Sequence, residues 1–205
     1  ASICEANNIH LIQLSTDFIF DGKDGPYDEK AKADPLSYYG WSKLKAEEIV
    51  KASKCKWTII RTVLVIGITE GMSRSNIVLW AKGALGKGQT INVVNDQFRS
   101  PTLAEDLAEG CMLAAIQGAE GVYNISGKDF MSVLELVQRV AKFYNLDESL
   151  IKPSTSEKLN QPAKRPPITG FILTKAINEL GYKPHSFEEA LAIMQKQIDF
   201  YETNG

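Results

Sequence analysis

Two apolar runs with a helical segment between them make up the first third of the chain. Residues 9–15, IHLIQLS, form a short apolar run that ends in the polar sequence STD, and residues 57–67, WTIIRTVLVIG, are apolar on both faces apart from Arg61. Such runs are typical of strands that helices cover on both sides, as in a parallel sheet. Residues 34–51 between them have the periodicity of a helix. The order strand, helix, strand predicts a βαβ unit.

The start of this first helix is marked by its own sequence. Asp34 is a candidate N-cap, and Pro35 suits the first helical position. Gly40 lies in the helix interior, where glycine costs about 1 kcal/mol relative to alanine. Such a glycine usually reflects the close approach of another group. A ligand near the helix and packing against another helix both explain it.

Three later helices are marked by the capping-box pattern, a hydroxyl residue followed three positions later by glutamate. The pattern occurs at residues 102–105 (TLAE), 132–135 (SVLE) and 186–189 (SFEE). Helices are predicted from these points to about residue 117, to about residue 145 and to the end of the chain. A shorter helix over residues 174–181 is closed by Gly181.

Two strands and two irregular segments complete the predicted elements. Residues 121–127, GVYNISG, and residues 89–96, QTINVVND, are predicted strands. The proline-rich residues 152–167 predict a long loop. The glycine cluster GALGKG at residues 83–88 follows a helix rather than a strand. It therefore indicates a helix C-terminus and a turn rather than a phosphate-binding loop.

Composition and charge narrow the expected partners. The 205 residues include 23 basic and 25 acidic side chains without a basic block, which disfavours nucleic acid and membranes as partners. No apolar run suits a membrane span and no signal peptide is visible, so a cytoplasmic protein is expected. Cys4, Cys55 and Cys111 are expected to be buried free thiols. With only His10 and His185, no metal site or Ser-His-Asp triad is expected.

Tyr39 and Lys43 are four residues apart, so a helix places them on the same face. The ordinary pKa of a tyrosine hydroxyl is about 10, and a neighbouring cation lowers it by stabilising the phenolate. The pair is therefore a candidate general acid and base. A solvated helix face without a catalytic role explains the same spacing.

Thr16 lies at the carboxyl end of the first predicted strand, where open α/β sheets bind their ligands. Its hydroxyl is a candidate donor to a substrate oxygen while Tyr39 supplies a proton. Asp17, the next residue, is a candidate for orienting or binding the substrate. The alternative for the sequence STD is a simple turn at the end of a strand.

Three stretches, STDFIFDG, PYDE and DPLSYYGWSK, together resemble the extended short-chain dehydrogenase/reductases, and among them the dTDP-4-dehydrorhamnose reductase-like family that binds sugar nucleotides. The resemblance covers nearly the whole chain. The family's strand after the catalytic helix is similar to RTVLVIG. A family segment near the nucleotide-sugar site is similar to NDQFRSPT and EDLA. The family's C-terminal stretch is similar to KRPPITGFILTKAINELGYKPHSFEEAL. The combination is specific, although each piece alone is not.

The resemblance implies a reductase that uses NADP or NAD to reduce a nucleotide-linked 4-keto-6-deoxy sugar for polysaccharide biosynthesis. It implies that Tyr39 protonates the keto oxygen and that Thr16 hydrogen-bonds the same carbonyl. Lys43 would lower the pKa of Tyr39 and hold the nicotinamide ribose, and Arg61 is a further candidate for binding the cofactor.

The expected substrate is a nucleotide-diphospho-sugar, and the candidates for binding it are Asp17, Asn76, Arg99 and Arg165. Arginine suits a diphosphate because its guanidinium donates two parallel hydrogen bonds. A surface ion pair is the alternative for each arginine, and a helix cap is the alternative for Asn76.

The family's glycine-rich dinucleotide loop has no counterpart in the first βα turn of this chain. Because each βαβ unit takes about 30 residues, roughly 90 residues of the usual N-terminal half are expected to be absent from this chain. The chain is therefore expected to be a fragment rather than a shortened relative, and to bind NADP(H) weakly or not at all. The helix that carries Tyr39 is expected to expose apolar surface and promote self-association, which leaves a homodimer open.

The expected fold is α/β, with an incomplete doubly wound parallel sheet that corresponds to the C-terminal half of a Rossmann domain. Residues 1–67 and 104–130 are expected to form this remaining part. Residues 68–103 and 131–205 are expected to form a smaller mixed α/β part that binds the nucleotide sugar.

Two other functions remain open. A nucleotide-sugar epimerase or dehydratase has the same scaffold, but dehydratases of this group carry a carboxylate two places after the strand-end threonine, where this chain has Phe18. The other alternative is a non-catalytic relative such as the regulatory subunit of methionine adenosyltransferase. The intact Tyr39 and Lys43 favour an enzyme over such a subunit.

Overall fold

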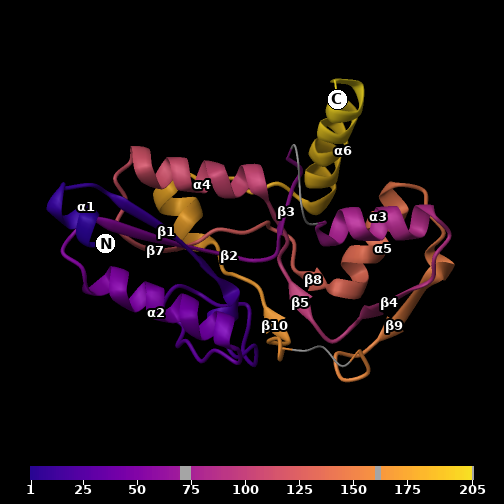
Figure 1. Ribbon diagram of the computed structural model, residues 1–205, viewed down its shortest axis with the longest axis horizontal. Helices are drawn as coiled ribbons and strands as arrows, with labels where there is room; N and C mark the ends of the chain where they lie inside the picture. Colours follow the sequence, from indigo (N-terminus) through magenta and orange to yellow (C-terminus); the bar gives the residue numbers. More distant parts are fainter. Residues whose placement is uncertain (70–74, 160–162, 205) are drawn as a thin grey trace.

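A three-stranded parallel sheet forms one half of the molecule (Figure 1). The computed structural model describes residues 1–69, 75–159 and 163–204, and in it the strands of this sheet lie in the order β1-β2-β7. The strands are β1 (Leu11–Thr16), β2 (Trp57–Thr62) and β7 (Gly121–Asn124). β1 pairs with β2 in parallel along its whole length, so both strands end at the same edge of the sheet.

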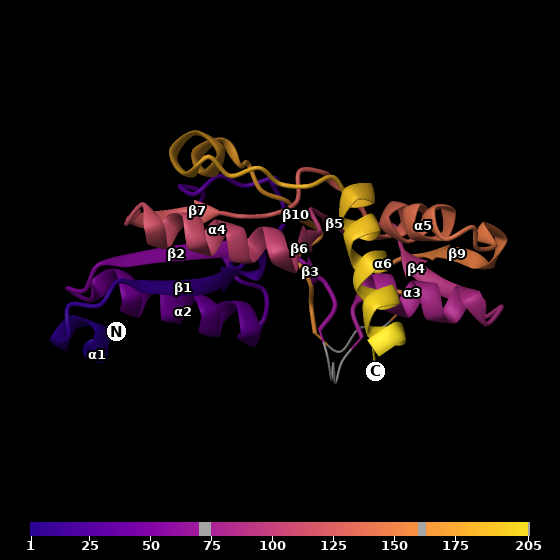
Figure 2. The same cartoon turned by 90° about the horizontal axis from the view of Figure 1, so that it is seen from above.

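Helices cover both faces of this sheet. α2 (Tyr38–Ala52) and α4 (Ala104–Ile116) lie on opposite sides of it (Figure 2). Ile59 and Ile60 are neighbours in β2 and point to opposite faces, yet both are fully buried. This is why β2 is apolar on both faces, and it confirms the predicted βαβ unit.

Further helices and a second parallel sheet form the other half. The elements there are α3 (Ile77–Gly86), β4 (Ile91–Val94), α5 (Val133–Phe143), β9 (Ile151–Ser154) and α6 (Phe187–Asn204). Their shared core includes Leu136, Leu191 and Met194, which are fully buried. β9 pairs with β4, so the loop predicted for residues 152–167 is wrong at its start.

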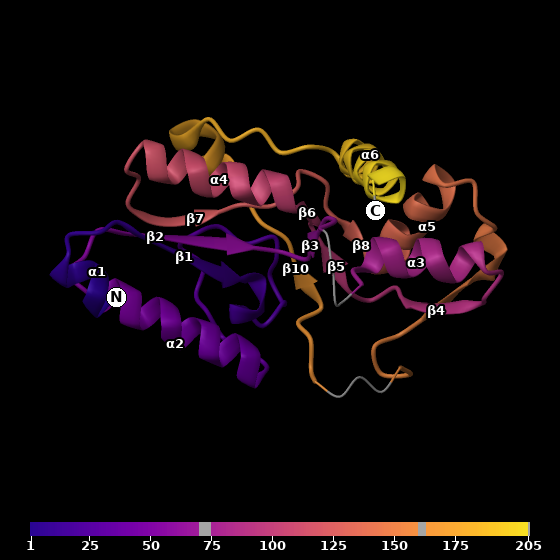
Figure 3. The same cartoon turned by 45° about the horizontal axis from the view of Figure 1, so that its top comes forward.

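Short strands lie at the junction of the two halves (Figure 3). β3 (Val65–Ile66) pairs with β6 (Thr102–Leu103), and β5 (Phe98–Arg99) lies between β10 (Ile168–Thr169) and β8 (Met131–Ser132). Short helical segments complete the fold: α1 (Ser2–Ala6), η1 (Asp17–Ile19), η2 (Glu148–Leu150) and η3 (Ala176–Leu180). The junction therefore combines segments that are far apart in the sequence.

Two predicted helix N-caps are wrong, because the residues predicted to cap form other hydrogen bonds. α2 begins after Ser37, whose hydroxyl accepts the Gly40 N–H at 3.2 Å, whereas the Asp34 N–H bonds to the Ile19 carbonyl in the segment before the helix. Pro35 likewise precedes the helix. At the start of α4, Thr102 does not cap, because its hydroxyl donates to the Val63 carbonyl at 2.6 Å.

Glycines end two helices as predicted. Gly181 follows η3 with a φ of 72°, a left-handed conformation that glycine adopts without strain. η3 is one turn of π-helix inside the predicted helix 174–181. α3 ends at Gly86, and Gly88 has a φ of 68°, which confirms a helix end and turn at residues 83–88.

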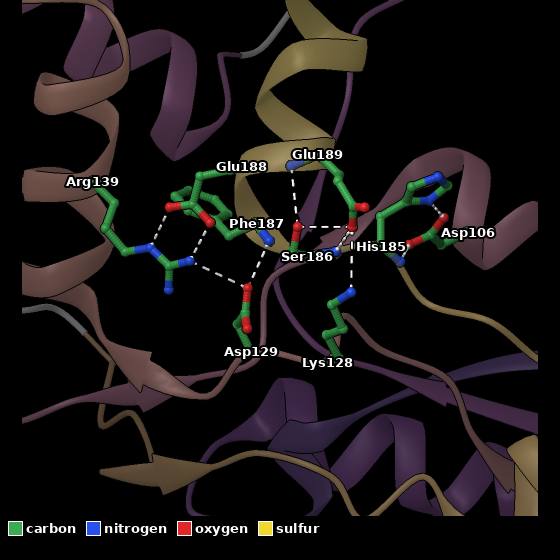
Figure 4. A network of polar contacts seen from close by, with 9 residues as sticks. All are labelled: Asp106, Lys128, Asp129, Arg139, His185, Ser186, Phe187, Glu188 and Glu189. Atoms are coloured by element: carbon green, nitrogen blue, oxygen red, sulfur yellow. Dashed lines mark hydrogen bonds and ion pairs between the residues drawn. The ribbon is translucent and has the colours of Figure 1, made fainter.

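The other two predicted capping boxes are confirmed. Ser132 accepts the Glu135 N–H at 3.0 Å at the start of α5. At the start of α6, Ser186 accepts the Glu189 N–H, and the Glu189 carboxylate accepts the Ser186 N–H at 2.6 Å (Figure 4). The backbone N–H and the hydroxyl of Ser186 lower the pKa of Glu189 to about 2.

Ion pairs and hydrogen bonds around the same point join the start of α6 and the residues before it to both halves of the molecule (Figure 4). Arg139 of α5 forms ion pairs with Glu188 and Asp129. His185 Nδ1 lies 2.5 Å from the buried carboxylate of Asp106 in α4. The first turn of α6 is therefore fixed against α4 and α5.

The outer surface of α2 carries exposed apolar side chains. Tyr38 is 81% exposed and stacks on Trp41, and Ile49 is 65% exposed. This confirms the expected exposure around the helix that carries Tyr39, and self-association stays a prediction. Within residues 1–69, 75–159 and 163–204, no helix combines the length and hydrophobicity that crossing a bilayer requires.

Candidate functional site

The carboxyl end of β1 opens into a cavity of about 280 Å³. Thr16 ends this strand, and Tyr39 enters the cavity from the first turn of α2. Asp17, Arg99 and Arg165 also line it. Five of the predicted site residues, which the sequence spreads over most of the chain, therefore meet at one place.

Thr16 and Asp17 form a hydrogen-bonded pair at the edge of the sheet. The Thr16 hydroxyl donates to Asp17 Oδ1 at 3.0 Å and accepts the Phe18 N–H at 3.3 Å. The Asp17 carboxylate also accepts a hydrogen bond from Thr169 of β10. Burial raises the pKa of Asp17, and the charge of Arg99 and the threonine hydroxyls oppose that rise.

Gly40 determines how closely the helix of Tyr39 approaches β1. A Cβ at Gly40 would lie 2.1 Å from the Phe18 carbonyl oxygen, so only glycine fits. The close approach that the sequence predicts is therefore made by the backbone of η1 rather than by a ligand. It also places the Tyr39 ring edge-to-face against the Phe18 ring, with centroids 5.9 Å apart.

We expect Gly40→Ala to destabilise the protein, because the backbone of η1 has to move away from the added methyl group. Overpacking of this kind typically costs about 1–3 kcal/mol. Gly83→Ala is the matched control: Gly83 lies inside α3, a Cβ there meets nothing within 4 Å, and alanine has the higher helix propensity. Urea unfolding measures both variants. Equal stability of the two would contradict the packing role of Gly40.

Lys43 lies one helical turn from Tyr39, beside the cavity rather than in its wall. Its Nζ donates to the Leu14 carbonyl oxygen of β1 at 2.8 Å. Among the described residues, no group hydrogen-bonds the Tyr39 hydroxyl, and Tyr39 is 53% exposed. The phenol is thus accessible to a ligand, with an ammonium group held close by on the same helix.

Arg61, predicted to bind a cofactor, is part of a buried ion pair. Its Nε and Nη2 donate to the two carboxylate oxygens of Glu47 in α2, at 2.9 and 2.8 Å, and Nη1 donates to the Glu29 carbonyl. Both charged side chains are almost wholly buried. Arg61 therefore fastens α2 to the sheet, and the structure does not bring it to the cavity of Tyr39.

A larger cavity of about 500 Å³ adjoins the first. Leu64, Arg99 and Arg165 line both cavities, and Asn76 lines the larger one. The Asn76 side chain caps α3, because Oδ1 accepts two backbone N–H groups and Nδ2 donates to the Gly67 carbonyl. The cap predicted as its alternative role is confirmed, and one N–H of the amide remains for a ligand.

The two predicted arginines differ in what they can bind. Arg99 is buried, and its Nη groups donate to the carbonyl oxygens of Phe98, Pro166 and Pro167. Its fork therefore holds the backbone before β10, and its assignment to the nucleotide sugar stays a prediction. Arg165 is exposed, and the described residues offer it no hydrogen bond or ion pair, so its guanidinium is available to an anion.

Leu64 is a functional candidate that the sequence did not indicate. It stands in the wall between the two cavities with a φ of 36°, which is rare for a residue with a side chain. Such strain costs on the order of 1–3 kcal/mol and is concentrated at binding and active sites. A leucine carries no sequence signal for this conformation, so only the structure reveals it.

Among the described residues, no three His, Cys, Asp or Glu side chains are grouped so that they could hold a metal ion. The three cysteines are free thiols, as predicted, but of the three only Cys55 is buried, and Cys4 and Cys111 are partly exposed. The chemistry that the site offers is instead a phenol, a hydroxyl and a guanidinium around connected space. These groups suit proton transfer to an oxygen at one end and recognition of an anion at the other.

Several known proteins are similar in sequence. A methionine adenosyltransferase 2 subunit beta from Danio rerio is 29% identical over 79% of this chain and 52% of its own length. A dTDP-4-dehydrorhamnose reductase from Mycobacterium tuberculosis is 30% identical over 80% of this chain and 55% of its own length. Across such relatives the chain spans between 46% and 68% of their lengths.

Solved structures share the fold. A dTDP-4-dehydrorhamnose reductase from Clostridium acetobutylicum matches 96% of this chain and 68% of its own with a TM-score of 0.86 and 27% identity. One from Bacillus anthracis, in complex with NADP, matches 95% and 68% with a TM-score of 0.82 and 26% identity. The model of the RmlD substrate binding domain matches residues 1–200. The chain therefore belongs to the RmlD substrate binding domain family.

Proposed function

We propose that the chain supplies the substrate site and the proton donor of an NAD(P)H-dependent reductase for a nucleotide-linked 4-keto-6-deoxy sugar. The observation that carries this proposal is that Arg165 lines both the cavity of Tyr39 and Thr16 and the larger adjoining cavity. One extended ligand can therefore place a carbonyl at Tyr39 and a diphosphate at Arg165. The name of the Mycobacterium tuberculosis relative, dTDP-4-dehydrorhamnose reductase, supports this substrate class and a role in deoxy-sugar biosynthesis.

Reduction of a ketone adds a hydride to its carbon and a proton to its oxygen. A nicotinamide supplies the hydride when it is bound. Tyr39 gives its hydroxyl proton to the oxygen, Lys43 stabilises the phenolate that remains, and Thr16 hydrogen-bonds the same oxygen. The Phe18 ring and Gly40 support this step by fixing the position of Tyr39.

The residues present fit the reactive end of a nicotinamide dinucleotide. Tyr39 and Lys43 are available to its ribose, and the Bacillus anthracis relative was solved with NADP. The diphosphate of a dinucleotide cofactor is bound in this fold by a glycine-rich turn from a strand into a helix, and the sequence of residues 1–205 contains none. The glycines at residues 83–88 lie at the C-terminal end of α3, where the helix dipole disfavours an anion.

We therefore expect residues 1–205 to bind NADPH with a Kd on the order of 1 mM or weaker. Isothermal titration calorimetry measures this directly, with dTDP as the comparison ligand. dTDP is expected to bind more tightly, because its diphosphate has Arg165 as a partner. A micromolar Kd for NADPH would show that these residues hold the dinucleotide by other means.

Arg165→Ala tests the substrate site. Loss of a charge-assisted hydrogen bond is expected to weaken dTDP binding by about tenfold or more. Lys164→Ala is the matched control, since Lys164 is the adjacent exposed cation and lines neither the cavity of Tyr39 nor that of Asn76. Equal losses in the two variants would indicate general charge attraction rather than a site at Arg165.

Two alternative functions can be distinguished from reduction. A dehydratase would need an acid where Phe18 packs against Tyr39, so this position favours reduction. A non-catalytic role is suggested by the 29% identity to the Danio rerio subunit. That role predicts dTDP binding without NADPH oxidation in the full product of the reading frame that encodes residues 1–205.

We also propose that the sheet β1-β2-β7 is part of a doubly wound Rossmann sheet. Residues 1–67 and 104–130 then belong to the dinucleotide-binding part, and residues 68–103 and 131–205 belong to the substrate part. The smaller cavity supports this division, because residues of both groups line it, whereas the larger cavity is lined almost entirely by the second group.

A further inference from the structure

Leu64 has a backbone conformation that few leucines adopt. Its φ of 36° lies in the left-handed region, where glycine and asparagine are far more common. Thr102 of β6 fixes this conformation, because its backbone N–H donates to the Leu64 carbonyl at 3.1 Å and its hydroxyl donates to the Val63 carbonyl at 2.6 Å. Strain of this kind persists only where the surrounding structure holds it.

The strained backbone places the Leu64 side chain where the two cavities meet. Among the described residues, Leu64, Arg99 and Arg165 line both cavities, and Leu64 is the apolar one of the three. The smaller cavity has two other apolar residues. Phe18 packs against Tyr39 at the reacting end, and Val65 is 40% exposed. Leu64 therefore supplies the apolar contact at the passage between the cavities.

The proposed ligand has a hexose between its two recognised ends. Its carbonyl is at C4 and its diphosphate is attached at C1, and these two carbons lie opposite each other in the six-membered ring. C5 is the neighbour of C4 and carries C6. A ligand that reaches from Tyr39 to Arg165 therefore has C6 on its flank. C6 is a methyl group in a 6-deoxy sugar and carries a hydroxyl in an ordinary hexose.

We propose that Leu64 is a specificity-determining residue that contacts C6 of the sugar and selects 6-deoxy sugars. The inference rests on the proposed function and names the residue that reads this part of the substrate. A methyl group gains an apolar contact with Leu64, whereas a hydroxyl there loses water and finds no partner on a leucine side chain.

Packing is the competing explanation for Leu64. Its side chain also contacts two hydrophobic cores, one that includes Leu136 and one that includes Phe20. A residue that only packs affects stability, and it does not affect the choice between two sugars. The ratio of two sugar affinities therefore separates the two explanations.

The test measures the Kd of residues 1–205 for dTDP-glucose and dTDP-6-deoxyglucose, which differ only by the C6 hydroxyl, by isothermal titration calorimetry. The wild type is expected to bind the 6-deoxy sugar about tenfold more tightly, because an apolar contact discriminates against an added hydroxyl by about this much. Leu64→Asn offers the hydroxyl a partner and suits the positive φ, so the ratio should fall to about twofold or less. Leu64→Met keeps an apolar side chain of similar volume and should keep the wild-type ratio.

Leu159→Asn is the matched control, because Leu159 lines the larger cavity without lining the smaller one and is 37% exposed. It should leave the ratio unchanged. The inference is overturned if the wild type binds both sugars equally, if folded Leu64→Asn keeps the wild-type ratio, or if Leu159→Asn changes the ratio as much. Circular dichroism reports folding. If Leu64→Asn does not fold, Leu64→Gly takes its place with the same expected ratio, since glycine also suits this φ.

Binding of dTDP itself separates this inference from the proposed function. Absence of dTDP binding to the wild-type chain would remove the proposed function, and this inference with it. Normal dTDP binding without a preference for the 6-deoxy sugar would remove only the role of Leu64.

Discussion

Tyr39→Phe is expected to lower kcat for reduction of a dTDP-4-keto-6-deoxy sugar by about 10²–10⁴-fold, the usual contribution of general acid catalysis. The nucleotide-sugar Kd is expected to stay nearly unchanged. The variant keeps the aromatic ring that packs against Phe18 and removes only the hydroxyl, which no described residue hydrogen-bonds. The rate is followed as NADPH consumption by the full product of the reading frame that encodes residues 1–205.

Tyr38→Phe is the matched control for this experiment. Tyr38 is the preceding tyrosine of α2, is 81% exposed and stacks on Trp41, and it does not line the cavity. Its variant is expected to have the wild-type kcat. A wild-type kcat in Tyr39→Phe would refute the assigned proton donor, whereas an equal fall in both variants would point to a general disturbance of α2.

Removing either partner of the Arg61–Glu47 ion pair is expected to destabilise the protein by about 3–5 kcal/mol, because the other charge stays buried and loses two charge-assisted hydrogen bonds. Both side chains are almost wholly buried and make two hydrogen bonds to each other. Arg61→Met and Glu47→Gln, measured by urea unfolding, test the expectation. Lys51→Met is the control, because Lys51 also contacts Glu47 but is partly exposed and should cost about 1 kcal/mol or less.

The same pair makes stability depend on pH in a defined direction. Burial raises the pKa of Glu47, but the hydrogen bonds and charge of Arg61 outweigh this, so the pKa lies below its ordinary value of 4.5. Glu47 therefore contributes stability above pH 4.5, and the contribution is lost as the pH falls through its lowered folded-state pKa. Glu47→Gln should show a smaller loss of stability over that acid range than the wild type. Parallel curves for the two proteins would contradict this role.

Local sequence was sufficient to predict those elements that depend only on residues close to them in the chain. The capping boxes at Ser132 and Ser186 are confirmed because each needs only its own helix. The N-cap predicted at Thr102 is wrong, because the Thr102 hydroxyl donates to the carbonyl of Val63, which follows β2. The end of α3 and the turn at Gly181 were predictable from glycine alone.

Site residues were predictable as a set, but their individual roles were not. Thr16, Tyr39 and Arg165 were proposed from motifs, and the structure places all three in one cavity wall. Gly40 signalled a close contact, but its partner, the Phe18 carbonyl, belongs to a different element. For Arg99, the acceptors are backbone carbonyls from a distant segment, so an arginine that holds the fold looks in sequence like one that binds a ligand.

The most direct test of the account is a crystal structure of residues 1–205 with a bound dTDP-4-keto-6-deoxy sugar. We expect the diphosphate within hydrogen-bond distance of Arg165, and the keto oxygen within about 2.7–3.2 Å of the Tyr39 hydroxyl. A nucleotide sugar bound outside the two cavities, or inside them with its keto group turned away from Tyr39, would contradict the proposed function.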